Sequence, residues 1–308
     1  MSYRARVRLL AGLLLVLSAL YFTGLAREPQ RREGRTFGWL EPGHLDLVDR
    51  IELFGSQGRV VLVRRNNIWY VSLGREYPAL QSRVDELFSA LTRRSSYTQR
   101  PGNPEDLLSL GLVEGRASRI LLSAGAGLPL LDLLLGIGDA LGRDAYFKVA
   151  SADRIYQGED RFSLHTETGI LSWLDLRLFS TENILKGPGM IQEIAVRPPD
   201  SPGHYNLRRD RGGWIMVGRE DRELDSLLTE AYVRSILWSE GEFLHDEVPN
   251  SIEGSLELHF GDGSSSLFMI GPLIEQYRLG FRQDGDYSFV LNQWTLDRLF
   301  RDPEYFYK

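Results

Sequence analysis

The sequence predicts an α+β protein: two tandem copies of an antiparallel-sheet-plus-helix unit that follow an N-terminal transmembrane helix. The first observation is a motif that occurs twice, Arg-Arg followed by a polar turn and a Trp, in residues 64–69 and again in residues 208–214. The second is that each Trp is followed by apolar residues at i, i+3, i+4 and i+7, the spacing of an amphipathic helix. The third is an uncharged run of 18 residues, 9–26.

Composition sets the broad class of protein. The chain has 308 residues, enough for two domains of ordinary size, and its 43% apolar and 25% charged residues are typical of a globular protein. The net charge of −6 argues against a nucleic-acid partner, which would require a basic patch. Cysteine is absent, which excludes a disulfide framework, a thiolate nucleophile, a cysteine metal site and a lipoprotein anchor.

Residues 1–26 are expected to form a membrane anchor. A helix over residues 9–26 would be about 27 Å long at roughly 1.5 Å per residue, which spans a thin bilayer core. A cleaved signal peptide is the alternative, with Gly24 and Ala26 as small residues at a cleavage site. We expect a single-pass protein of the inner (cytoplasmic) membrane with its main domain on the extracytoplasmic, periplasmic side.

The first unit is predicted over residues 46–185, after a linker at 27–45 that is charged and interrupted by Pro and Gly. It begins with two strands and a tight turn at Asn66 and Asn67, residue types that accept positive φ. A helix over 81–94 follows, with its apolar stripe toward the sheet. A short helix and a β-meander then complete the unit.

The second unit, residues 186–308, repeats this order without the short helix. Its helix is expected near residues 222–238. The apolar stripe predicted to face the sheet consists of Leu224, Leu227, Leu228 and Ala231.

Four tryptophans take equivalent places in the two predicted copies. Trp69 and Trp214 follow the Arg-Arg turn, and Trp173 and Trp294 each lie six positions before a Phe in the closing segment of a copy. This equivalence favours core packing over a ligand cage for all four. Trp39, in the predicted linker, is expected at the membrane interface.

The order of these features resembles a known family. The pattern is a strand, an Arg-Arg turn, a strand that begins with Trp and a helix, then a short helix with Leu110-Gly111-Leu112 and a glycine-punctuated meander that contains Tyr146. It is similar to the bacterial domain-of-unknown-function family numbered 4340, over most of the chain beyond residue 45. The resemblance implies one amino-terminal membrane anchor and association with ABC-2-type transporter components, including gliding-motility-type auxiliary proteins. It implies no catalytic residues.

The glycine-rich run 136–142 superficially resembles a dinucleotide fingerprint. Its spacing departs from G-x-G-x-x-G, and a strand rather than a long helix follows, so a turn between strands is favoured. The acidic turns at Asp262-Gly263 and at residues 284–286 lack the further acids of calcium loops and match hairpin turns.

The histidines and acids suggest no reaction. None of the five histidines has the i, i+4 spacing of a zinc helix, although residues 165–167 offer a weak metal pair of His and Glu. No G-x-S-x-G elbow occurs, and acids such as Glu159 and Asp160 are ordinary surface residues. No catalytic, cofactor-binding or metal-ligating residues are therefore predicted.

These observations lead to a non-catalytic extracytoplasmic accessory or scaffold subunit of an ABC-2-type transport or motility-like membrane complex. The expected partners are the membrane and ABC-type permease and ATPase components, the latter from the family resemblance. Two alternatives remain: an envelope module that binds a glycan or peptide in the groove between the two units, and a cell-envelope hydrolase whose acids converge only in three dimensions.

Overall fold

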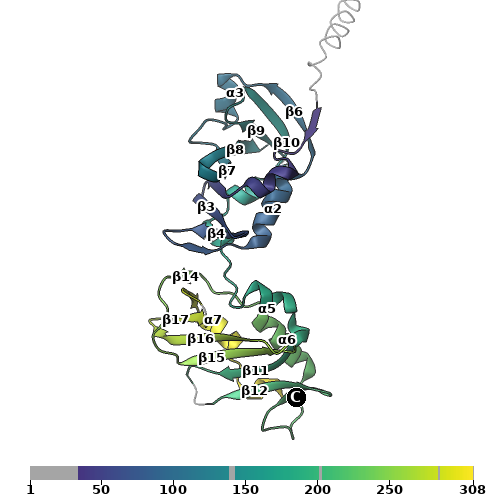
Figure 1. Cartoon of the computed structure of the whole chain (residues 1–308), viewed down its shortest axis with the longest axis vertical. Coiled ribbons are helices and arrows are strands. Elements are labelled where there is room, and N and C mark those ends of the chain that lie inside the picture. The colour runs from purple at the N-terminus through teal and green to yellow at the C-terminus, as the bar shows by residue number, and fades with distance from the viewer. Residues whose placement is uncertain (1–33, 139–142, 201–202, 284, 308) are drawn as a thin grey trace, which may run out of the picture. The chain divides into compact units, whose positions relative to one another are not determined.

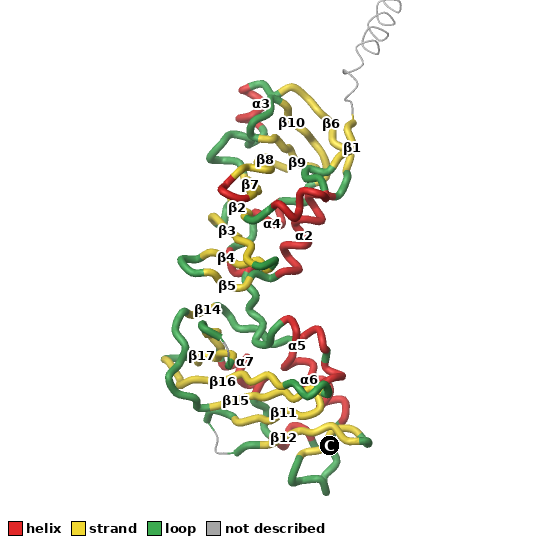
Figure 2. Tube along the Cα trace, in the orientation of Figure 1, coloured by secondary structure: helices red, strands yellow, loops and turns green. Residues whose placement is uncertain are grey.

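A computed structural model describes residues 34–138, 143–200, 203–283 and 285–307. The chain divides into two compact units, the first ending at Leu174 and the second beginning at Asp175. Each unit contains one antiparallel sheet and a few helices, which Figure 1 labels along the chain and Figure 2 colours by type. The molecule is therefore α+β, as the sequence predicts.

The sheet of unit 1 has ten strands in the order β1-β6-β10-β9-β8-β7-β2-β3-β4-β5. Every pair of neighbours that the structure describes is antiparallel. The strands are β1 (Gly34–Phe37), β2 (Arg50–Gly55), β3 (Gly58–Arg65), β4 (Ile68–Ser72), β5 (Glu76–Pro78), β6 (Ser95–Pro101), β7 (Ser118–Ala124), β8 (Leu128–Gly138), β9 (Asp144–Val149) and β10 (Arg154–Glu159).

Alternation along β2 shows how the sheet acquires a buried face. Ile51 and Leu53 are buried, and Ile51 lies opposite Leu62 of β3 and Leu122 of β7. Glu52 points to the other face, since successive side chains of a strand alternate. The turn between β3 and β4 has positive φ at two consecutive Asn residues, 66 and 67, as the sequence predicts.

The longest helix that the structure describes in unit 1, α2 (Gln81–Thr92), packs on this buried face. It contributes Val84, Leu87 and Leu91, all fully buried. The side-chain amide of Gln81 also accepts from the Trp69 amide at 3.1 Å and donates to the Trp69 carbonyl at 3.0 Å, which fixes the start of α2 against β4. The other helices of the unit are α3 (Pro104–Ser109), α4 (Ser163–Thr166) and the 3₁₀ helices η1 (Pro42–Leu47), η2 (Gly125–Gly127) and η3 (Ile170–Trp173).

The sheet of unit 2 has eight strands in the order β13-β12-β11-β15-β16-β17-β18-β14, again antiparallel. They are β11 (Ile191–Arg197), β12 (Tyr205–Asp210), β13 (Gly213–Met216), β14 (Leu244–His245), β15 (Gly254–Phe260), β16 (Ser265–Ile274), β17 (Tyr277–Arg282) and β18 (Ser288–Leu291). The helices are α5 (Thr181–Lys186), α6 (Ser226–Leu237), α7 (Gln293–Leu299), η4 (Pro188–Met190) and η5 (Pro303–Phe306).

The stripe predicted for α6 is wrong by part of a turn. Asp225 caps the helix by accepting from the amides of Leu227 and Leu228, so these two residues lie in the first turn and are exposed. The buried face is formed instead by Thr229, Tyr232, Val233 and Ile236.

Each unit closes by a hydrogen bond to the start of its long helix. The amide of Leu80, before α2, donates to the carbonyl of Trp173 at 2.8 Å. The amide of Asp225, before α6, donates to the carbonyl of Phe306 at 2.7 Å. Trp173 and Phe306 are each the last residue of a 3₁₀ helix, and both side chains are fully buried.

The unit boundary lies earlier than the predicted 185/186. Residues from Asp175 onward belong with unit 2 because the Leu178 amide donates to the Ser239 carbonyl at 2.8 Å, and the Arg282 guanidinium donates to the Leu178 carbonyl at 3.0 Å. The predicted linker also differs at its end: β1 and η1 lie within residues 34–47, and β1 pairs with β6.

The predicted anchor, residues 1–26, lies outside the described residues. Among residues that the structure does describe, no helix has the length and apolar character needed to cross a membrane.

Candidate functional site

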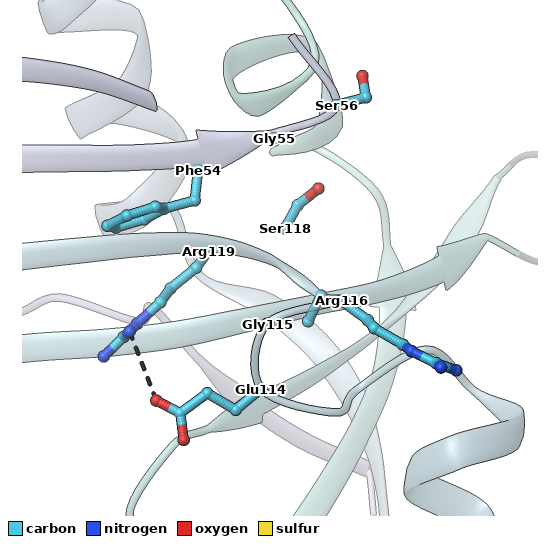
Figure 3. A pocket seen from close by; sticks show the side chains of 9 residues that line it. Phe54, Gly55, Ser56, Glu114, Gly115, Arg116, Ser118 and Arg119 are labelled. Carbon is cyan, nitrogen blue, oxygen red and sulfur yellow. Dashed lines mark ion pairs between the residues drawn. The ribbon is translucent and has the colours of Figure 1, made fainter. Parts of the chain in front are cut away.

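A pocket of about 440 Å³ lies in unit 1, beside the turn that joins β2 and β3. One wall is this turn, and the other is the segment that leads into β7 (Figure 3). The residues that line it are Phe54, Gly55, Ser56, Glu114, Gly115, Arg116, Ala117, Ser118 and Arg119. Within the described chain we take this pocket as the candidate site.

Glycines shape both walls. Gly58 and Gly115 have φ values of 106° and 82°, a region that favours glycine because it lacks a Cβ. Gly55 allows a close approach: a Cβ built there would lie 1.7 Å from the carbonyl oxygen of Thr166 in α4. The position of the pocket wall is thus fixed by the contact between α4 and the end of β2.

Arg119 is the central charged residue of the pocket. Its guanidinium donates two hydrogen bonds of 2.7 Å to the carboxylate of Asp132 on β8, a bidentate pair. These bonds raise the pKa of Arg119 above its usual value. The carboxylate of Glu114 faces the same guanidinium at 3.7 Å, and Figure 3 shows Arg116 directed away from this pair.

A second group of charges continues from the pocket across the sheet. The guanidinium carbons of Arg59 and Arg119 lie 5.3 and 5.8 Å from the ring centre of Phe54. Glu52 accepts hydrogen bonds from Arg50 and Arg59. Burial raises the pKa of Glu52, but these two hydrogen bonds outweigh it, so the pKa lies below its usual value.

This arrangement can bind a polar molecule. Ser56 and Ser118 present hydroxyl groups, Arg116 presents a cation and Glu114 an acceptor. Arg119 is already held by two carboxylates, and the residues that line the pocket include no histidine to act as a general base. The pocket offers hydrogen-bond donors and acceptors to a ligand.

A smaller pocket of about 330 Å³ lies in unit 2, where η5 meets β12 and β13. Tyr205 lies in its wall and donates from its hydroxyl to the Arg301 carbonyl at 2.9 Å. Burial raises the pKa of this Tyr205 hydroxyl. Since the hydroxyl is already bonded to the backbone, it helps to close the unit rather than to contact a ligand.

The glycine-rich run and the acidic turn have structural positions. Residues 136–138 end β8, while residues 139–142 and 284 lie outside the described part of the chain. Asp262 lies in the turn between β15 and β16, where its carboxylate accepts from the Ser264 hydroxyl and amide and pairs with Lys186 at 2.9 Å. The hydrogen bonds from Ser264 lower the pKa of Asp262.

The histidines are dispersed. His165 is buried on α4, whereas His259 is half exposed on β15, 3.6 Å from Glu257. Among the residues that the structure describes, no group of three or more His, Asp or Glu side chains is arranged to hold a metal ion.

Glu159 pairs with Arg161, and Asp160 caps the turn into α4 through the Ser163 amide at 3.1 Å.

The prediction that all four equivalent tryptophans pack in the core is wrong for one of them. Trp69, Trp173 and Trp214 are buried, but Trp294 is 66% exposed because it lies in the first turn of α7. Trp39 packs in unit 1 instead of standing apart in a linker: its indole donates to the Tyr97 hydroxyl at 2.9 Å.

The pocket was not anticipated from the sequence. It forms where the segment before β7 approaches a hairpin turn about 60 residues earlier, and no local motif marks that contact.

The comparisons with known proteins give one match. The family model described as Domain of unknown function (DUF4340) matches residues 69–240, which is more than half of the chain and extends from β4 to the end of α6. No curated protein and no solved structure matches. The chain therefore belongs to the DUF4340 family.

Proposed function

We propose that the chain is a non-catalytic accessory or scaffold subunit of an ABC-2-type transport or motility-like membrane complex. In this proposal residues 1–26 anchor it in the inner membrane, and both units lie on the extracytoplasmic side. The link to a transporter rests on the family resemblance, and the surface described below supports a role in binding a protein partner.

We also propose that the units are two copies of one ancestral unit. The order β4-β3-β2-β7-β8-β9-β10-β6 of sheet 1 corresponds strand for strand to β13-β12-β11-β15-β16-β17-β18-β14 of sheet 2. In chain order, α2 follows β4 and precedes β6 in unit 1. In the same way α6 follows β13 and precedes β14 in unit 2. β1 and β5 are the strands of sheet 1 outside this correspondence.

The helices and closing residues support the same proposal. Trp69 precedes the first residue of α2 by twelve positions, as Trp214 precedes that of α6, and both helices have 12 residues. The carbonyls of Trp173 and Phe306 accept the corresponding closing hydrogen bonds, so the counterpart of Trp173 in unit 2 is Phe306 and not Trp294.

The observation that carries the scaffold proposal is an exposed aromatic surface on unit 2. Trp238, Phe243 and Trp294 are 54%, 43% and 66% exposed. Trp238 follows α6, Phe243 precedes β14 and Trp294 lies at the start of α7. Asn292, before α7, donates a hydrogen bond to Glu242, beside Phe243. We call these three residues the aromatic surface.

Its composition is that of a protein-binding surface. Trp is enriched among the residues that dominate binding energy, as is Arg, and the Arg298 guanidinium lies 4.6 Å from the Trp294 ring centre. In this proposal the three side chains contact one partner, since exposed apolar surface is where proteins bind each other.

Site-specific crosslinking tests the proposal. A photoreactive amino acid replaces Trp294 or, as a matched control, Leu273, which is 56% exposed on the same unit. After irradiation of cells and mild detergent extraction, position 294 should crosslink to an ABC-type permease or ATPase and position 273 should not. Crosslinks from 294 only to other copies of the chain or to cell-wall fragments would contradict the assignment.

A second candidate function is an envelope module that binds a glycan or a peptide. The pocket beside Ser56 and Ser118 favours it, because the two hydroxyls, Arg116 and Glu114 can bond to such a ligand. Saturation-transfer NMR with cell-wall glycan fragments and with peptides should detect binding that Ser118→Trp abolishes by filling the pocket. Binding unaffected by this substitution would count against the pocket.

A further inference from the structure

A cluster of two buried side chains and one half-buried arginine lies in unit 1 where α2, α4 and η3 meet. It consists of Arg83, His165 and Trp173, which we call the closing cluster. The guanidinium carbon of Arg83 lies 4.9 Å from the Trp173 ring centre, and the His165 and Trp173 ring centres are 6.0 Å apart. His165 is 5% exposed and Trp173 is fully buried.

Each member of the closing cluster has a buried nitrogen without a hydrogen-bond partner among the described residues. These atoms are Nε of Arg83, Nδ1 of His165 and Nε1 of Trp173. Unpaired buried polar groups destabilise a fold, so packing alone does not explain three of them in contact.

Unit 2 builds the corresponding place from residues without these nitrogens. Arg83 is the third residue of α2, and Leu228 is the third residue of α6. His165 follows the N-cap of α4 by three positions, as the buried Thr295 follows the N-cap of α7. Phe306 takes the place of Trp173 in the closing hydrogen bond. The combination of an imidazole, an indole and a guanidinium is therefore found at this place in unit 1 and not at the corresponding place in unit 2.

The surroundings of His165 contain few charges. α4 packs against β2 and β7, whose residues on that face are Ile51, Leu53, Ile120 and Leu122, all apolar and buried. The charged groups nearby are Arg83 and Glu86 from α2, and Glu167 directly after α4. Burial is the main cause of a lowered His165 pKa, Arg83 lowers it further, and Glu86 partly opposes them.

The geometry points to an acid-sensitive device: protonation of His165 places a second cation beside Arg83 in a buried site and releases the closing segment, residues 163–174, from α2. Three hydrogen bonds hold this segment in the closed state. Arg83 donates to the Leu164 carbonyl at 3.0 Å and to the Thr168 hydroxyl at 2.7 Å, and Trp173 accepts from Leu80. The closing segment of unit 2 contains no histidine. Its Glu304 pairs with Arg222 and Arg219, and the hydrogen bond from Arg222 lowers the pKa of that carboxyl below its usual value, so this segment should stay closed at pH 5.0.

The sign follows from proton linkage. His165 is neutral when buried, and in the open segment it binds a proton near its ordinary pKa of about 6.5. Closure is therefore fully favourable above that pH. As the pH falls below it, the open fraction rises by at most about tenfold per pH unit, because one proton is bound.

Hydrogen exchange of the whole chain, followed by mass spectrometry at pH 7.5 and pH 5.0, tests this inference. Exchange rates are corrected for their intrinsic pH dependence. Peptides from residues 163–174 should lose protection at pH 5.0 by about tenfold or more, while peptides from residues 293–307 keep theirs. His165→Thr, the residue of unit 2, should remove the pH effect, and the control His259→Gln, on the half-exposed His259, should retain it.

An equal loss of protection in both segments would overturn the inference, as would a full pH effect in His165→Thr. Should that variant fail to fold, His165→Gln takes its place, and the imidazole ¹³C resonance of wild-type His165 is titrated directly. A ring that remains protonated at pH 7.5, or that titrates without any change in exchange of residues 163–174, would also overturn it.

Discussion

The carbonyl of Trp173 accepts a hydrogen bond of 2.8 Å from the amide of Leu80, the residue before α2. The next residue, Leu174, forms a β-bridge with Ala79. The end of unit 1 is thereby joined to the start of α2. The indole of Trp173 is fully buried there. Trp173 thus contributes twice: its backbone carbonyl holds the residue before α2, and its side chain is buried in the unit.

Trp173→Ala should destabilise unit 1 by about 3–5 kcal/mol, because it removes a fully buried Trp and leaves a cavity. The slowest-exchanging amides of β2 and β7, followed by hydrogen exchange, report the free energy of unfolding of this unit. Trp294→Ala is the matched control: that Trp is exposed, so the change should stay within about 0.5 kcal/mol. Similar costs at both positions would contradict the assigned burial.

Phe306→Ala should destabilise unit 2 by about 3–5 kcal/mol. The Phe306 ring is fully buried, and its centre lies 4.9 Å from that of Tyr232 on α6. Protection of β11 and β15 amides should fall, with unit 1 unaffected. The neighbouring Tyr305→Ala removes a partly exposed ring and should cost much less, so an equal effect would show that η5 does not close the unit through Phe306.

Gly55→Ala should destabilise unit 1 by about 1–3 kcal/mol or more, because the new Cβ would meet the carbonyl of Thr166 and push α4 away. Gly43→Ala serves as control, since a Cβ there meets no atom within 4 Å. Urea unfolding of both variants gives the comparison. Equal midpoints would mean that α4 does not pack on Gly55 as described.

Glu52 should contribute to the stability of unit 1 in a pH-dependent way. Its pKa is lower in the folded state, so its ion pairs with Arg50 and Arg59 stabilise fully above the ordinary carboxyl pKa of about 4.3. This stability is lost as the pH falls through the lower folded pKa. Glu52→Gln should flatten the acid limb of a stability curve between about pH 3 and 7, whereas Glu41→Gln, at an exposed residue, should leave it unchanged. A curve for Glu52→Gln that follows the wild type would refute the role.

Local structure was largely predictable from the sequence. Turn chemistry at Asn66 and Asn67 located a hairpin, and the 3.6-residue period located α2 within two residues of its end. The meander predicted after the short helix is formed by β7, β8, β9 and β10. These signals lie within a few neighbouring residues, where backbone preference and alternation act directly.

Features that depend on distant contacts were not predictable in the same way. Trp173 and Trp294 share a local pattern, yet one is buried and the other exposed, because the closing hydrogen bond selects Phe306 in unit 2. Likewise Asp225 caps α6, and the buried face of that helix differs from the stripe that the sequence predicts. The pocket near Ser118 arises from an approach between segments far apart in the chain, which no single motif records.

Two consecutive units with corresponding strand order can misassemble. The closing segment of one can dock on the helix of the other while the chain folds. The different closing residues oppose this exchange. If Phe306 docked on α2, the Arg83 guanidinium would lose its contact with the larger indole. If Trp173 docked on α6, it would have to fit beside Tyr232 in a site that the smaller Phe306 ring fills. The different closing residues should therefore let each segment recognise its own helix.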